Sequence, residues 1–110
     1  MTVFSRQKDQ EIPKNQYTKW FDYDKIKGTL SLRHRQPGDY LTLPSGGRKT
    51  LKSWMIDEKI PRQEREQIWL LAEEKHILWI VGHRISAYYK ITEQTKTILE
   101  VEFNGGKSSG

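Results

Sequence analysis

The sequence has 110 residues and a formal net charge of +5, with 35% hydrophobic and 30% charged residues. This length suits one domain of ordinary size, and the absence of cysteine excludes disulfides and thiolate metal sites. Four Trp, five Tyr and three Phe argue against disorder. No apolar run reaches the roughly 18 residues of a membrane helix, and no signal-peptide pattern opens the sequence. We therefore expect a soluble cytoplasmic protein without a membrane partner.

Polar segments without periodicity flank the part of the sequence that we expect to fold. Residues 1–16 predict a linker or lead-in, and residues 104–110, rich in Gly and Ser, predict a flexible tail. The folded domain is then expected over residues 17–103. Within it, clustered aromatic residues favour a strand over residues 17–26.

The next segments predict a second strand, a turn and two helices. Alternation over residues 29–35 places Leu30, Leu32 and His34 on one face of a strand, and a Pro-Gly turn follows. Apolar residues at helical spacing predict a helix from about residue 49 to residue 59. Proline at position 61 ends this helix and opens a short one over 61–68.

Strands return in the last third of the sequence. They are predicted over residues 68–73, 76–81 and 96–103. Residues 77–81 are apolar at every position, which indicates a strand buried on both faces. The order of elements predicts an α+β fold, with a small antiparallel or mixed sheet and a helical pair inserted between strands.

Positive charge is concentrated in residues 33–52, which contain five basic residues and one acidic residue, Asp39. Such a patch is typical of a polyanion partner, although a merely solvated basic surface has the same composition. Two arginines of the predicted strand would share one face about 7 Å apart and could follow successive phosphates. Tyr88 and Tyr89 lie between Arg84 and Lys90, and aromatic residues are interleaved with cations in this way on nucleic-acid surfaces. We expect these RNA-binding residues: Arg33, Arg35, Arg48, Lys49, Lys52 and Arg84.

The stretch "LPSGGRKTL" (43–51) resembles a phosphate-binding loop, because two glycines are followed by two basic residues and a threonine. It departs from the Walker A pattern, because Arg48 precedes the lysine and Thr42 stands where the first glycine belongs. It also has Lys49 where the pyrophosphatase-type Ser-Gly-Gly-x-Asp-Ser loop has Asp. We interpret the glycines as a hinge into a basic helix whose start attracts anions. Alternatively, they only supply unusual backbone angles.

Catalytic and metal chemistry have no support in the sequence. The three histidines, His34, His76 and His83, are not spaced four residues apart, and no carboxylate completes a zinc pattern. No nucleophile motif is present. We therefore assign no catalytic, cofactor-binding or metal-binding residue.

Three stretches together resemble a known family. "LRHRQPGDYL" (32–41), "GGRKTLKSWMIDEKIPRQER" (46–65) and "LWIVGHRIS" (78–86) are similar, in this order and spacing, to segments of the C-terminal domain of bacterial tRNA(Ile)-lysidine synthetases. That domain is itself similar to a module of the phenylalanyl-tRNA synthetase β-subunit. In the family motif, basic residues occupy the positions of Arg33, Arg35, Lys49, Lys52 and Arg84.

The resemblance implies a function for the chain. The parent enzyme of this family is an ATP-dependent ligase that joins lysine to the wobble cytidine of a CAU-anticodon isoleucine tRNA, forming lysidine. The catalytic loop belongs to an N-terminal domain outside this chain. The chain would then be no enzyme and hold no cofactor, while ATP and lysine serve the parent. Its expected partners are the tRNA(Ile) acceptor stem and the parent's N-terminal domains.

Two other functions remain open at this point. The domain could be a protein–protein docking or dimerisation module of the same enzyme, with the basic patch facing acidic protein. It could also be a nucleotide-binding enzyme built on the glycine loop.

Overall fold

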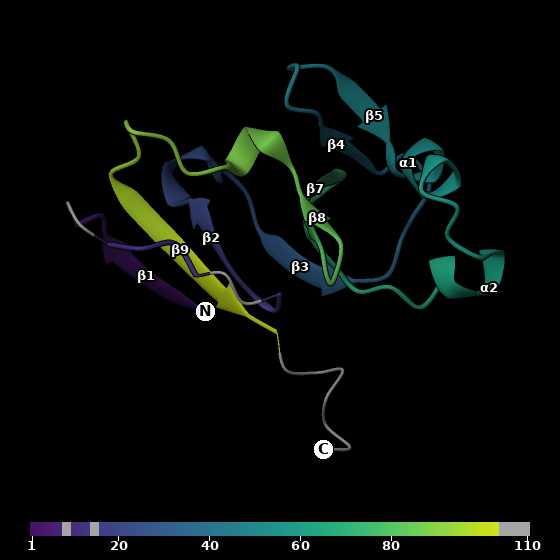
Figure 1. Ribbon diagram of the computed structural model, residues 1–110, viewed down its shortest axis with the longest axis horizontal. Helices are drawn as coiled ribbons and strands as arrows, with labels where there is room; N and C mark the ends of the chain where they lie inside the picture. The colour runs from purple at the N-terminus through teal and green to yellow at the C-terminus, as the bar shows by residue number, and fades with distance from the viewer. Residues whose placement is uncertain (8–9, 14–15, 104–110) are drawn as a thin grey trace. The chain divides into compact units, whose positions relative to one another are not determined.

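The computed structural model describes residues 1–7, 10–13 and 16–103, and the chain divides into two compact units (Figure 1). The first unit contains residues 1–26 and the C-terminal part from Tyr89 onward, and the second contains Lys27–Tyr88. Both contain antiparallel strands, and the helical pair lies between strands of the second unit. This confirms the predicted α+β class. No helix in the described part of the chain is long and apolar enough to cross a membrane.

The first unit is a three-stranded antiparallel sheet with the order β1-β9-β2. Its strands are β1 (Thr2–Ser5), β2 (Thr18–Asp22) and β9 (Thr97–Glu102). Strand β1 lies within the lead-in predicted over residues 1–16, because its four exposed or half-buried residues show no period of their own. Pairing with β9 orders them. The tail predicted over 104–110 lies outside the described residues.

The strand predicted over residues 17–26 ends early, at Asp22. A short 3-10 helix, η1 (Tyr23–Lys25), follows, and the Asp22 side chain accepts a hydrogen bond from the Asp24 N–H at 3.2 Å. The Thr95 hydroxyl donates to the other oxygen of Asp22 at 3.1 Å. A side chain that caps the next turn stops the strand here.

The second unit contains a mixed sheet with the order β3-β6-β7-β4-β5, and β8 also pairs with β7. The β4–β7 pair is parallel and the other pairs are antiparallel. The strands are β3 (Leu30–Arg33), β4 (Tyr40–Thr42), β5 (Arg48–Thr50), β6 (Leu70–Glu73), β7 (His76–Ile80) and β8 (Arg84–Ile85). Helices α1 (Leu51–Asp57) and α2 (Arg62–Arg65) connect β5 to β6, and η2 (Ala87–Tyr89) follows β8.

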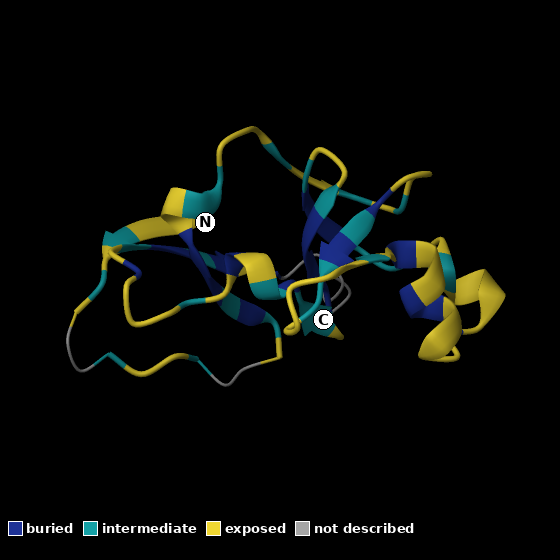
Figure 2. Ribbon diagram, turned by 90° about the horizontal axis from the view of Figure 1, so that it is seen from above, coloured by how far each residue is buried: buried dark blue, intermediate teal, exposed yellow. Residues whose placement is uncertain are grey.

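A hydrophobic core joins α1 to this sheet. Leu51, Trp54 and Met55 lie at helical spacing and are at most 4% exposed. They belong to one buried cluster with Leu41 of β4 and residues of β6 and β7. Residues 77–81 are all buried, as predicted for a strand covered on both faces (Figure 2). Each such large side chain contributes about 1.5–3 kcal/mol, so this core fixes the start of α1 against β4.

Strand β3 is shorter than the strand predicted over residues 29–35. On the face that alternation assigned to Leu30, Leu32 and His34, Leu32 is 50% exposed. The physical reason is position: β3 is an edge strand that pairs with β6, whereas α1 packs at the β4–β5 end of the sheet.

Candidate nucleic-acid interface

The glycine stretch forms the turn of the β4–β5 hairpin. The Leu43 N–H donates to the Gly47 carbonyl and the Gly46 N–H to the Leu43 carbonyl, both at 2.8 Å. Gly46 has φ +99°, a conformation that favours glycine. The prediction of a glycine hinge leading directly into a helix is therefore wrong: Arg48 and Lys49 lie on β5, because the segment after the turn pairs with β4.

The start of α1 is already supplied with hydrogen-bond acceptors. Thr50 caps the helix by accepting from the Ser53 N–H at 3.1 Å, and the Leu51 N–H donates to the Asp39 carbonyl at 2.9 Å. The helix has only seven residues. Its N-terminus is therefore committed to the protein itself rather than to an anion.

Asp39 organises the Pro-Gly turn that follows β3. Its carboxylate accepts two hydrogen bonds of 2.9 Å from the Arg33 guanidinium and one of 2.8 Å from the Gln36 N–H. The Asp39 side chain is 1% exposed and that of Arg33 16%. Arg33 also donates to the carbonyls of His34 and Glu74. Its guanidinium, which the sequence analysis assigned to RNA, thus holds the turn in place.

Lys75, in the turn between β6 and β7, holds the same segment from another direction. Its ammonium donates to the Pro37 carbonyl at 2.9 Å and to the Gln36 side chain at 3.4 Å. Gly38 has φ +89°, which the tight turn requires. The turn is therefore a rigid support for its neighbour Arg35.

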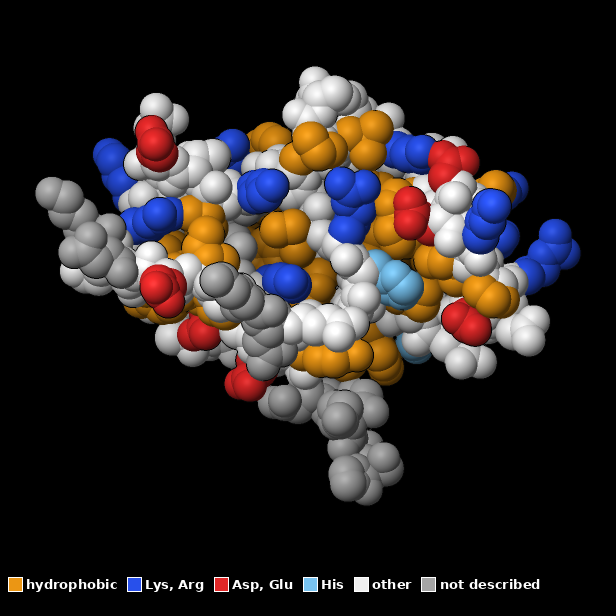
Figure 3. Space-filling view, in the orientation of Figure 1, with side chains coloured by type: hydrophobic (Ala, Val, Ile, Leu, Met, Phe, Trp, Pro, Cys, Tyr) orange, Lys and Arg blue, Asp and Glu red, His pale blue; other side chains and the backbone are white. Residues whose placement is uncertain are grey.

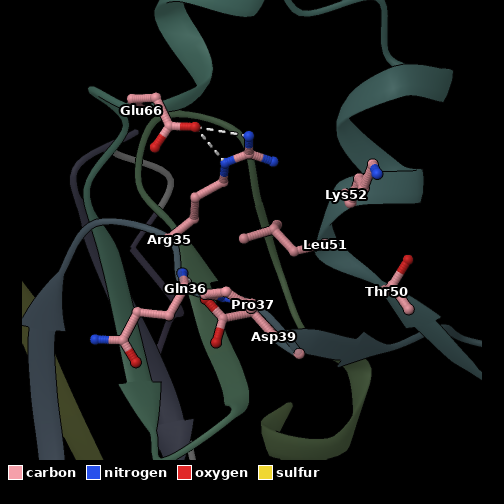
Figure 4. A pocket seen from close by; sticks show the side chains of 9 residues that line it. Arg35, Gln36, Pro37, Asp39, Thr50, Leu51, Lys52 and Glu66 are labelled. Atoms are coloured by element: carbon pink, nitrogen blue, oxygen red, sulfur yellow. Dashed lines mark hydrogen bonds and ion pairs between the residues drawn. The ribbon is translucent and has the colours of Figure 1, made fainter.

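A surface pocket of about 560 Å³ lies between this turn and the start of α1 (Figure 4). Arg35 and Lys52 line it from opposite segments, and Leu51 lies between them. The other lining residues are Gln36, Pro37, Gly38, Asp39, Thr50 and Glu66. Arg35 pairs with Glu66 at 2.6 Å, whereas Lys52 is exposed and has no ion pair among the described residues. The pocket therefore brings two of the predicted cations together.

Arg48 belongs to a stack of planar groups on the hairpin. Its guanidinium carbon lies 4.4 Å from the centre of the Tyr40 ring, and Tyr40 stacks on His76 at 4.6 Å. Tyr88 continues the stack, 5.2 Å from His76. Tyr40 and His76 were not among the predicted site residues, because no strand was predicted where β4 lies; the alternation of "DYLTL" was the available signal.

His76 is held neutral by its surroundings. Burial, together with the nearby charge of Arg48, lowers the pKa of His76 below its ordinary value of 6.5, and Glu73 opposes this shift. The Nε2 atom lies 3.0 Å from the Thr42 hydroxyl. A neutral imidazole can accept that hydrogen bond and stack between two tyrosines without a charge of its own.

The remaining predicted cations lie elsewhere. Lys49 points to the face of β5 opposite Arg48 and forms an ion pair with Asp57 of α1. Arg84 lies on β8, partly buried and without an ion pair in the described part of the chain. Figure 3 shows Lys and Arg side chains interspersed with acidic ones where β5 and the helices lie in Figure 1. Three of the six predicted residues, Arg33, Arg35 and Lys49, thus pair with carboxylates.

Over residues 1–7, 10–13 and 16–103, no group of three or more His, Asp or Glu is placed to hold a metal ion.

The fold and the pocket define an α+β domain with a cation-lined surface cavity. Residues 30–102 match the family described as the TilS substrate C-terminal domain, and the chain belongs to this family. The resemblance of the three motifs is thereby confirmed.

Relatives with curated names support this membership. The chain is 46% identical to a tRNA(Ile)-lysidine synthase of Caldanaerobacter subterraneus over 84% of its length, and 41% identical to one of Clostridium tetani over 87%. It spans 20% and 21% of those proteins, about a fifth of their length. A crystal structure of a TilS C-terminal domain matches with a TM-score of 0.63 and 26% identity, covering 93% of this chain and 84% of that one.

Proposed function

We propose that this chain is the tRNA-binding domain of a tRNA(Ile)-lysidine synthetase and contacts the acceptor stem of the CAU-anticodon isoleucine tRNA. The family and the names of its relatives support the tRNA class. The observation that carries the proposal is the surface pocket, which Arg35 and Lys52 line from opposite segments. Two cations at one cavity suit the phosphates of a nucleic-acid backbone.

The chemistry fits an RNA helix in particular. The major groove of A-form RNA is too deep and narrow for side chains, so proteins recognise its phosphates and 2′-hydroxyls. Arg48, ordered by stacking on Tyr40, presents a planar guanidinium beside the pocket-lining Thr50 of the same strand. Such an ordered guanidinium loses less side-chain entropy when it binds a phosphate.

The contacts divide the six predicted residues into two roles. Arg35, Arg48, Lys52 and Arg84 are proposed to reach the RNA. Arg33 and Lys49 are proposed to support these contacts, because Arg33 is bound to Asp39 and Lys49 joins β5 to α1 through Asp57. Arg33 cannot turn to a phosphate without leaving the buried Asp39 carboxylate unpaired.

The chemistry of lysidine formation is proposed to belong to the rest of the parent protein. ATP and lysine would bind to N-terminal domains that make up most of the relatives' length. This domain would then hold no cofactor, and would raise the affinity of the parent for its tRNA by adding a second point of contact.

The test is a titration of the chain with isoleucine tRNA, with elongator methionine tRNA as the competitor. Lys52→Ala and Arg48→Ala should each weaken binding severalfold. Lys27→Ala removes an exposed charge of the same unit that does not line the pocket, and it should leave the affinity nearly unchanged. Retained affinity in both pocket variants, or an equal loss in Lys27→Ala, would contradict the assignment.

Docking on the parent's own domains is the second candidate function. Leu32 and Ile56 are each 50% exposed, so two large apolar side chains are accessible to a protein partner. Association of the chain with the remainder of the parent, without affinity for either tRNA, would support this alternative.

A further inference from the structure

In the structure, the Arg35 guanidinium is paired with the Glu66 carboxylate, although the proposed function requires Arg35 to bind RNA. Resting on that function, we propose that the pocket takes one RNA phosphodiester between Arg35 and Lys52, and that the Glu66 carboxylate competes with it for Arg35. The domain thus carries an acidic group that holds the place of the phosphate until RNA binds.

The geometry of the pair supports competition. One oxygen of Glu66 accepts from Nε of Arg35 at 2.7 Å and lies 2.6 Å from Nη2 (Figure 4). This edge of a guanidinium also suits a phosphate, because carboxylate and phosphate both accept from two neighbouring N–H groups. Glu66 and a phosphate therefore cannot use it together.

The charges of the pocket depend on three side chains. Asp39 also lines it, but its carboxylate is 1% exposed and paired with Arg33. The remaining charges are those of Arg35, Lys52 and Glu66. Glu66 halves the positive charge that the phosphate meets, and a phosphate that displaces it can bridge both cations.

Glu66 can also leave at small cost. Its side chain is 61% exposed and that of Arg35 is 26% exposed. Helix α2, which Glu66 follows, has no fully buried residue. Exposed ion pairs of this kind are weak, and breaking one changes an equilibrium constant by less than about fivefold.

The test is a set of tRNA titrations with the whole 110-residue chain. Glu66→Gln should bind about two- to fivefold more tightly than the unaltered chain. Glu64→Gln is the matched control: it makes the same change in net charge on α2, but Glu64 is exposed and does not line the pocket. It should change affinity less than Glu66→Gln.

Backgrounds that remove each cation make the test specific. In Arg35→Gln, the gain from Glu66→Gln should fall to that of Glu64→Gln, whereas in Lys52→Gln it should persist. Equal gains from the two glutamate variants, or a gain independent of Arg35, would overturn the competition while leaving RNA binding intact. Absence of tRNA binding in every variant would overturn the proposed function as well.

A last comparison identifies the source of the phosphate. ATP at millimolar concentration is added to the tRNA titrations. We expect no displacement beyond that caused by its ionic strength. Displacement of tRNA by ATP that strengthens in Glu66→Gln would show a nucleotide site and overturn the assignment to the RNA backbone.

Discussion

Replacing Asp39 with asparagine tests whether the Pro-Gly turn is a structural centre. Asp39 accepts three hydrogen bonds and neutralises Arg33, whose side chain is 16% exposed. An amide group has one acceptor oxygen, so at least one charge-assisted bond is lost and the guanidinium keeps no counter-charge. Breaking a fully buried pair costs about 3–5 kcal/mol. Because Arg33 keeps some solvent and two carbonyl acceptors, we expect a loss of about 2–4 kcal/mol in the free energy of unfolding.

Urea denaturation followed by circular dichroism measures this loss. Glu66→Gln makes the same change of acid to amide in an exposed pair and should cost about 0–1 kcal/mol. Hydrogen exchange at the Leu51 amide gives a local readout, since this N–H donates to the Asp39 carbonyl. Equal midpoints for the two variants, with unchanged exchange at Leu51, would refute the structural role of Asp39.

Two further predictions concern His76 and the hairpin turn. Because the pKa of His76 is lowered in the folded chain, the unfolded chain binds more protons below pH 6.5, so the stability contributed by neutral His76 is lost as the pH falls below that value. His76→Gln should therefore show a smaller loss of stability between pH 7 and about pH 5 in parallel urea titrations, and identical pH profiles would exclude this role. Gly46→Ala should cost about 1–2 kcal/mol because of its positive φ, although no atom lies within 4 Å of the added Cβ. Gly47→Ala, whose φ is not in that range, is the matched control and should cost less in the same melts; equal losses would show that backbone angle does not decide the effect.

Much of the fold could be predicted from periodicity. The run of residues 77–81 identified a buried strand, and Leu51, Trp54 and Met55 identified the buried face of α1. Strands β4 and β5 were missed, because each has three residues and takes its order from pairing and from the core under Leu41. Pairing partners of such short segments lie far away in the sequence, and local pattern does not encode them.

The site shows the same division. Charge density drew attention to residues 33–52, and Arg35 and Lys52 from this window line the pocket. The sequence could not show that Arg33 is bound to Asp39 six residues later, or that Lys49 pairs with Asp57. Whether a cation faces a phosphate or a carboxylate depends on tertiary contacts, so a count of basic residues overstates the number available to RNA.

The salt dependence of tRNA affinity tests the central claim most directly. Each phosphate neutralised contributes about −0.7 to −0.9 to the slope of log K against log salt. One phosphate shared by Arg35 and Lys52 and one each for Arg48 and Arg84 therefore predict a slope of roughly −2 to −3. Arg48→Ala should reduce its magnitude by about one, and Lys27→Ala should leave it unchanged. An affinity for isoleucine tRNA that does not vary with salt, or a slope that Arg48→Ala leaves unaltered, would contradict the account.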